Sequence, residues 1–129
     1  MKHFLTAICI FLFSCSLHAY ELSQQEIEFV KSLQVALESD NRHWISESVS
    51  YPLKVTTQNG AKIVINKEEL LNDFESVFNC AIKKAVKQQD LNNIFSNWQG
   101  LMLGSDGQVW ITTVEDNGGE RSWIIAINH

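Results

Sequence analysis

The segment 67–87 carries the pattern that most constrains the fold, a broad apolar stripe. Asn66 precedes it as a candidate N-cap, and Glu69 follows at the third helical position, as in a capping box. The apolar residues recur at spacings of three and four: Leu70, Leu71, Phe74, Val77, Phe78, Ala81, Ile82 and Ala85. This spacing predicts one helix from Lys67 to about Lys87. Because the stripe is too wide for an isolated surface helix, we expect the helix to lie across a sheet.

Two shorter helices are predicted before this segment. Ser23-Gln24-Gln25-Glu26 has the pattern of a capping box, and apolar residues at helical spacing follow it to about Glu38. Asp40-Asn41 ends that helix and can cap a second one, from Arg42 to about Ser48. The second helix directs Trp44, Ile45 and Val49 towards the core.

The strands are predicted from alternation and turn residues. Tyr51-Pro52 ends the second helix, because a residue before proline is pushed towards extended geometry. Residues 53–57 and 62–65 form a hairpin around Asn59-Gly60. The last third predicts a meander of three strands: 94–103, 108–114 and 121–128. The sequence therefore predicts an α+β fold with a mostly antiparallel sheet.

Residues 1–19 have the order of a secretory signal peptide. Lys2 is followed by an apolar run over 4–13 and by a polar stretch that ends on Ala19. The run is shorter than the roughly 20 apolar residues that span a bilayer. We therefore expect cleavage after Ala19 and one exported domain, 20–129, that is periplasmic or secreted. Leu12-Phe13-Ser14-Cys15 leaves an alternative, because it resembles a lipobox in which Cys15 becomes lipidated.

Composition limits the partners of this domain. Nine Lys and Arg stand against fifteen Asp and Glu after residue 19, so the net charge is 9 − 15 = −6. Binding to nucleic acid requires clustered cations, which makes such a partner unexpected. The one basic cluster, Lys83-Lys84 with Lys87, lies where it complements the dipole of the predicted long helix. Cys80 is the only cysteine left, so it forms no internal disulfide, and we expect it half-buried on that helix.

Candidate catalytic groups are few. The chain shows no His/Cys/Asp cluster with metal-ligand spacing and no Gly-rich loop before a helix, so neither a metal nor a cofactor is predicted. Tyr51 is the best hydroxyl candidate, and Asp40 or His43 could act as the acid or base. No residue is assigned a catalytic role.

Four local motifs carry a resemblance to a known family. They are Trp44-Ile45, Tyr51-Pro52-Leu53, Trp98-Gln99-Gly100 and Gly107-Gln108-Val109-Trp110. With the order of the elements, they make the chain resemble the nuclear transport factor 2-like superfamily, which includes the SnoaL-like and ketosteroid isomerase-like proteins. The resemblance is closer to small exported members of unassigned role than to the enzymes. It implies a cone-like curved sheet wrapped on helices, with an apolar cavity at its wide end. Because that superfamily hosts several activities, the fold does not select one.

The aromatic residues are the candidate ligand-binding groups: Tyr51, Trp98, Trp110 and Trp44. We expect the first three to line one cavity that stacks a flat apolar ligand, with core packing as the alternative for the tryptophans. The leading functional hypothesis is an exported non-catalytic module for a small apolar ligand or a protein partner, with a possible homodimer through the sheet face. The alternatives are an isomerase- or dehydratase-like enzyme acting on an apolar carbonyl compound and a periplasmic inhibitor or immunity-type protein.

Overall fold

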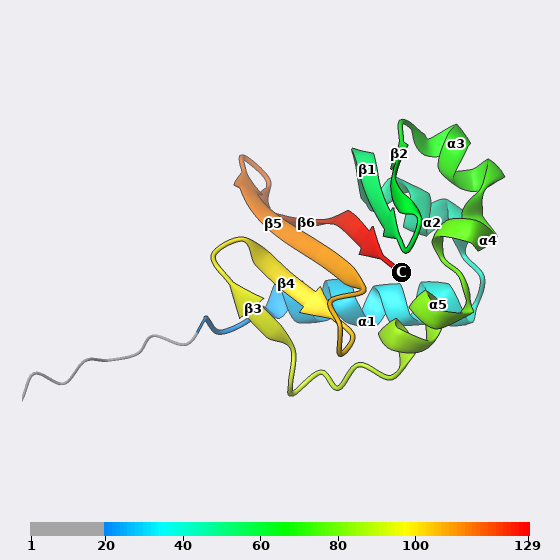
Figure 1. Cartoon of the computed structure of the whole chain (residues 1–129). Helices are drawn as coiled ribbons and strands as arrows, with labels where there is room; N and C mark the ends of the chain where they lie inside the picture. Colours follow the sequence, from blue (N-terminus) through cyan, green and yellow to red (C-terminus); the bar gives the residue numbers. More distant parts are fainter. Residues whose placement is uncertain (1–19) are drawn as a thin grey trace, which may run out of the picture.

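The computed structural model describes residues 20–129. The predicted signal peptide and Cys15 lie outside the described residues. Five helices and six strands follow one another in this order: α1 Gln24–Glu38, α2 Arg42–Glu47, β1 Val49–Thr57, β2 Gly60–Val64, α3 Lys67–Asn72, α4 Phe74–Val77, α5 Cys80–Lys87, β3 Phe95–Asn97, β4 Gly100–Leu103, β5 Val109–Asp116 and β6 Gly119–Asn128. Figure 1 shows α1 running beside the sheet, with α3 and α4 at the end where β1 and β2 lie.

The sheet has the strand order β2-β1-β6-β5-β4-β3. The pairing of β1 with β6 is parallel, and every other neighbouring pair is antiparallel. The sheet is open, with β2 and β3 as its edges. The predicted α+β class with a mostly antiparallel sheet is confirmed.

The two N-terminal helices are also confirmed. The Ser23 hydroxyl accepts a hydrogen bond from the Glu26 amide at 3.2 Å, and the Glu26 carboxylate accepts one from the Ser23 amide at 2.9 Å. The Asn41 side chain accepts from the Trp44 amide at 3.2 Å and so caps α2. Both helices therefore begin where side-chain acceptors satisfy amides that have no partner within the helix.

The predicted continuous helix over 67–87 is wrong, because the segment forms α3, α4 and α5. Asp73 leaves helical geometry at φ −119° and ψ 25°. Asn79 is extended, and its side chain accepts from the Ile82 amide at 3.0 Å, which starts a new helix. Most of the apolar stripe nonetheless enters the core, because Leu70, Phe74, Val77, Phe78 and Ile82 are buried. Leu71 and Ala85 are half-buried and Ala81 is exposed, whereas Val86, outside the predicted stripe, is buried. Cys80, expected half-buried, is exposed because it opens α5.

The predicted strand 94–103 is also wrong, because it is the hairpin of β3 and β4. Trp98-Gln99 forms its turn, between the paired residues Asn97 and Gly100. The Asn97 side chain accepts from the Gln99 amide at 2.9 Å, a local bond that favours a turn over a strand. Gly100 has φ +143°, and a Cβ there would lie 2.2 Å from the Ile111 carbonyl oxygen, so only glycine fits. The C-terminal meander therefore has four strands.

The two faces of the sheet differ. The inner face packs its apolar residues into the core with α1 and the stripe of 67–87: Leu53, Val55, Leu101, Leu103, Ile111, Ile124 and Ile127. On the outer face, the register aligns one row across all six strands: Phe95, Met102, Trp110, Ala126, Lys54 and Ile63. The residues of this outer row are half-buried or exposed, so the row is not part of the core.

Candidate functional site

One groove lies between α5, the loop 88–94 and the β4 end of the sheet, and we call it the α5–β4 groove. Its volume is about 540 Å³, within the roughly 300–1,000 Å³ typical of small-molecule sites. Its apolar lining comes from Ala81, Ala85, Phe95 and Met102. Its polar lining includes Lys84, Gln88, Gln89, Asp90, Asn93 and Gln108. A surface of this composition can hold a ligand that is part apolar and part polar.

One glutamine fixes the walls of the α5–β4 groove. The Gln89 side-chain oxygen accepts from the Gly104 amide at 2.7 Å and so joins the loop to the turn after β4. Its side-chain nitrogen donates to the carbonyls of Asp90, at 3.0 Å, and Asn93, at 3.1 Å. From α1, the Gln34 side chain donates to the carbonyls of Val86, at 3.0 Å, and Gln89, at 3.1 Å. These bonds fix the loop 88–94 to α1 and to the turn after β4, and a fixed site lowers the entropic cost of binding.

The turn after β4 approaches α5 closely at Gly104. This residue has φ +88°, and a Cβ there would lie 2.0 Å from the Gln108 side-chain oxygen and 3.2 Å from the Ala85 Cβ. Gln108 is held in turn, because its side chain accepts from the Asp106 amide at 3.0 Å. The end of the groove is therefore formed by backbone and fixed side chains.

Three polar side chains of the groove are free to bind a ligand. Within residues 20–129, the side chains of Lys84, Gln88 and Asn93 make no hydrogen bond or ion pair with the protein. Lys84 lies on α5, Gln88 follows one helical turn later as the C-cap of that helix, and Asn93 lines the same groove from the loop. The groove thus combines a fixed frame with solvent-exposed donors and acceptors at its rim that have no partner within residues 20–129.

A second cavity of about 310 Å³ lies between α1 and α2, and we call it the α1–α2 groove. Trp44 lines it, together with Lys31, Ser32 and Val35. The Trp44 ring packs against Phe29 with 5.7 Å between centroids. Of the four aromatic residues proposed from the sequence, Trp44 is thus the one that lines a described groove.

The other three aromatic residues lie apart from both grooves. Trp98 occupies the β3–β4 turn and is 76% exposed, so it is not on a strand as expected. Trp110 lies on the outer sheet face, paired with Met102 and Ala126. The Tyr51 hydroxyl donates to the Ser46 carbonyl at 2.7 Å. The structure therefore does not bring Tyr51, Trp98 and Trp110 together around one of these cavities.

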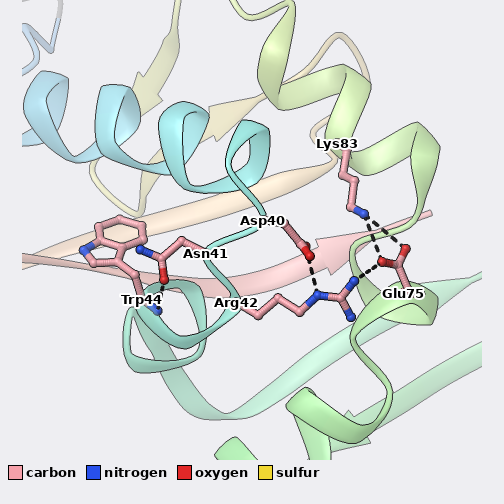
Figure 2. A network of polar contacts seen from close by, with 6 residues as sticks. All are labelled: Asp40, Asn41, Arg42, Trp44, Glu75 and Lys83. Atoms are coloured by element: carbon pink, nitrogen blue, oxygen red, sulfur yellow. Dashed lines mark hydrogen bonds and ion pairs between the residues drawn. The ribbon is translucent and has the colours of Figure 1, made fainter.

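The candidate acid–base groups belong to surface ion pairs. Figure 2 shows Arg42 between Asp40 and Glu75, with Lys83 reaching the same Glu75 carboxylate from above. Arg42 Nε lies 2.9 Å from Asp40 Oδ1, and Lys83 Nζ lies 3.1 Å from Glu75 Oε2. The hydrogen bond from Lys83 is the main cause that lowers the pKa of Glu75. Asp40 therefore serves a network that ties the start of α2 to α4 and α5.

His43 and Tyr51 show no catalytic arrangement either. His43 Nε2 lies 3.2 Å from Glu47 Oε1 on the exposed side of α2. The pKa of Glu47 is lowered, first by its hydrogen bond from Lys67 and then by His43. Partial burial, with a smaller effect of Glu68, raises the pKa of Tyr51 to about 12, so the phenol is protonated at neutral pH. None of Tyr51, Asp40 and His43 lines either groove.

Two features are absent from residues 20–129. In this part of the chain, no group of three or more His, Cys, Asp or Glu side chains is placed to hold a metal ion. None of the helices described has the length and apolar character needed to cross a membrane. Comparison of the chain with protein-family models, curated proteins and solved structures finds no match.

The α5–β4 groove was missed at the level of sequence. Its signal is the run Gln88–Asn93, in which five of the six residues carry an amide or a carboxylate, directly after the apolar stripe. Such a run is typical of a solvated loop, and nothing local shows that the turn after β4 folds back onto it. The bond between Gln89 and Gly104 joins residues 15 positions apart, which the sequence pattern does not reveal.

Proposed function

We propose that this chain is a small non-catalytic binding protein and that the α5–β4 groove is its ligand site. The observation that carries the proposal is the contrast within the groove between fixed and free groups. Gln89 and Gln108 are occupied in holding the walls, whereas the side chains of Lys84, Gln88 and Asn93 have no partner in residues 20–129. Such a site is preorganised and still able to form new hydrogen bonds.

The experiment is a titration of the ¹⁵N-labelled domain with a library of small fragments, followed through amide chemical shifts. We expect the shifts to cluster at Ala85, Gly104 and Ser105, which line the groove. Ala81→Trp should fill the groove and abolish them. Ser32→Trp, which fills the α1–α2 groove instead, is the matched control and should leave them unchanged. Shifts that cluster at Trp44 and Val35 would assign the site to the α1–α2 groove and contradict the proposal.

We further propose that the protein is exported and is a member of the nuclear transport factor 2-like superfamily with a cone-like sheet. The order of helix, short helix, hairpin, helical segment and antiparallel meander supports the family, and the charged, apolar and small segments of residues 1–19 support export. The mass of the protein recovered from an exporting cell tests the localisation. An N-terminus at Tyr20 supports it, a lipidated Cys15 supports the lipoprotein alternative, and an intact Met1 overturns both.

The outer sheet face favours a protein partner as a second candidate function. Ile63, Phe95 and Val114 are exposed on it, and Arg121 stacks over the Trp123 ring at 4.2 Å. A second copy of the chain, or a target of an inhibitor or immunity-type protein, could cover this face. Sedimentation of the domain with and without Ile63→Asp tests the homodimer, since the substitution should reduce the dimer fraction.

A further inference from the structure

We infer that the α5–β4 groove binds a neutral carbohydrate, with a sugar ring placed over Phe95 and its hydroxyl groups bonded to Gln88 and Asn93. The inference rests on the proposed function and names the chemical class of the ligand. It follows from three properties of the groove: the kind of polar groups at its rim, the balance of charge and the position of its one aromatic ring.

The polar groups at the rim are mainly side-chain amides. The side-chain amides of Gln88 and Asn93 each offer a carbonyl acceptor and two N–H donors, and neither side-chain amide has a hydrogen-bond partner within residues 20–129. A hydroxyl group likewise donates one hydrogen bond and accepts others, so it can pair with either end of an amide. A purely apolar ligand would leave both amides desolvated and unpaired, which is unfavourable. The rim therefore matches a ligand rich in hydroxyl groups.

The charges at the rim balance. Lys84 and Asp90 line the same groove with opposite sign. Asp90 Oδ1 accepts from the Asn92 amide at 2.9 Å, and a carboxylate has further acceptor sites for ligand hydroxyls. Lys84 adds three donors. An anionic or cationic ligand would gain from one of these groups and lose to the other, whereas a neutral polyol can use both.

Phe95 provides the apolar surface. Phe95 is 55% exposed, and Met102 is its partner across β3 and β4. A sugar ring has an apolar face of C–H groups that can lie flat on an aromatic ring while its hydroxyls point outward to the rim. Ala81 and Ala85 complete an apolar lining about as extensive as the polar one. This geometry favours a sugar over a peptide, whose larger side chains would need deeper apolar pockets.

The test uses the ¹⁵N-labelled domain 20–129 and named probes. The probes are three neutral trisaccharides (maltotriose, cellotriose and chitotriose), octanoate and a blocked trialanine peptide. We expect at least one of the trisaccharides to shift the amides of Ala85, Gly104 and Ser105, with an affinity that does not change with salt. Phe95→Ala should weaken that binding by about tenfold or more, and Gln88→Ala by several-fold. Gln58→Ala, an exposed amide in the β1–β2 turn, is the matched control and should have no effect.

Each outcome decides between the inference and the proposed function. If octanoate or the peptide binds in the groove and no trisaccharide does, the carbohydrate inference is overturned and the proposed function stands. If a trisaccharide binds but Phe95→Ala and Gln88→Ala leave its affinity unchanged, the inference is likewise overturned. If neither these probes nor the fragment library shifts the groove amides, both proposals fall. Phe95 and Gln88 are exposed, so their variants should fold, and unchanged amide spectra elsewhere would confirm it.

Discussion

The helix α1 and the segment 67–87 carry the same kind of apolar pattern, but only α1 is one continuous helix. In α1, buried residues recur as Phe29, Val30, Leu33 and Ala36 without interruption. In 67–87, the buried residues are spread over three short helices with breaks at Asp73 and Asn79. The same apolar periodicity thus occurs in one continuous helix and in three short ones.

The difference lies in where the capping side chains fall. Ser23 and Asn41 stand outside the apolar pattern of α1, so their hydrogen bonds mark its beginning and the start of the next helix. Asn79 stands inside the pattern of 67–87, between the buried residues Phe78 and Ile82. Its side chain offers the Ile82 amide an acceptor that an uninterrupted helix would supply from the backbone. Apolar spacing therefore predicts most of the buried residues but not the ends of the helices. At Asn79 a side-chain cap starts the new helix, whereas Asp73 marks the other break without a side-chain cap bond.

The largest expected effect tests burial in the interrupted segment. Phe78 is fully buried and stacks on Phe74 with 5.0 Å between ring centroids. Phe78→Ala should lower the free energy of unfolding by about 3–5 kcal/mol, because it removes a large apolar side chain and leaves a cavity. Urea denaturation measures this change in the free energy of unfolding. Val35→Ala on the exposed side of α1 is the control and should change stability by less than about 0.5 kcal/mol. Equal small losses for both variants would mean that the segment does not pack as described.

A smaller effect tests the break itself. Asn79→Ala removes the cap of α5 and should cost about 0.5–2 kcal/mol, as should Ser23→Ala at the start of α1. Circular dichroism in the far ultraviolet should show no gain of helix for Asn79→Ala, because burial of Phe78 and Ile82 holds the break in place. A stability gain with increased helix signal would show instead that Asn79 alone interrupts a helix that the rest of 67–87 favours.

The same reasoning explains how much of the fold could be predicted. The α+β class, the helices α1 and α2, the β1–β2 hairpin and the strands near β5 and β6 follow from local caps, turns and alternation. The β3–β4 hairpin was missed because its turn, Trp98-Gln99, contains none of the residues that usually signal one. The local hints are the flanking residues Asn97, whose side chain bonds the Gln99 amide, and Gly100. The need for glycine at position 100 comes from the carbonyl of Ile111 on a neighbouring strand.

The candidate site was less predictable than the fold. The sequence hypothesis selected large aromatic side chains, because these dominate binding surfaces in general. The α5–β4 groove instead depends on amides in the run Gln88–Asn93 and on long-range bonds from Gln34 and to Gly104. Phe95 is the one aromatic residue that lines the groove, and the sequence pattern placed it within the strand predicted over 94–103. Tertiary contacts between distant loops decide such a site, and local patterns do not encode them.

The smallest expected effect concerns the ion pairs that join the two compared regions. Arg42, which follows the end of α1, and Lys83 of α5 both pair with Glu75 of α4. The pKa of Glu75 is lowered from 4.5, first by Lys83 and then by Arg42. A lowered pKa means that the folded state favours the ionised carboxylate. Its contribution to stability is therefore present above pH 4.5 and is lost as the pH falls through the lowered value.

Glu75→Gln should slightly lower stability at neutral pH and make the loss of stability below pH 4.5 less steep. Because the network is exposed, added salt should shrink the neutral-pH effect. Urea denaturation at neutral pH and below pH 4.5 measures the change in the free energy of unfolding. Glu115→Gln in the β5–β6 hairpin is the exposed control and should leave the loss of stability at acid pH unchanged. A Glu75→Gln profile identical to that of the unsubstituted protein would mean that the network does not couple α1 and α2 to the interrupted segment.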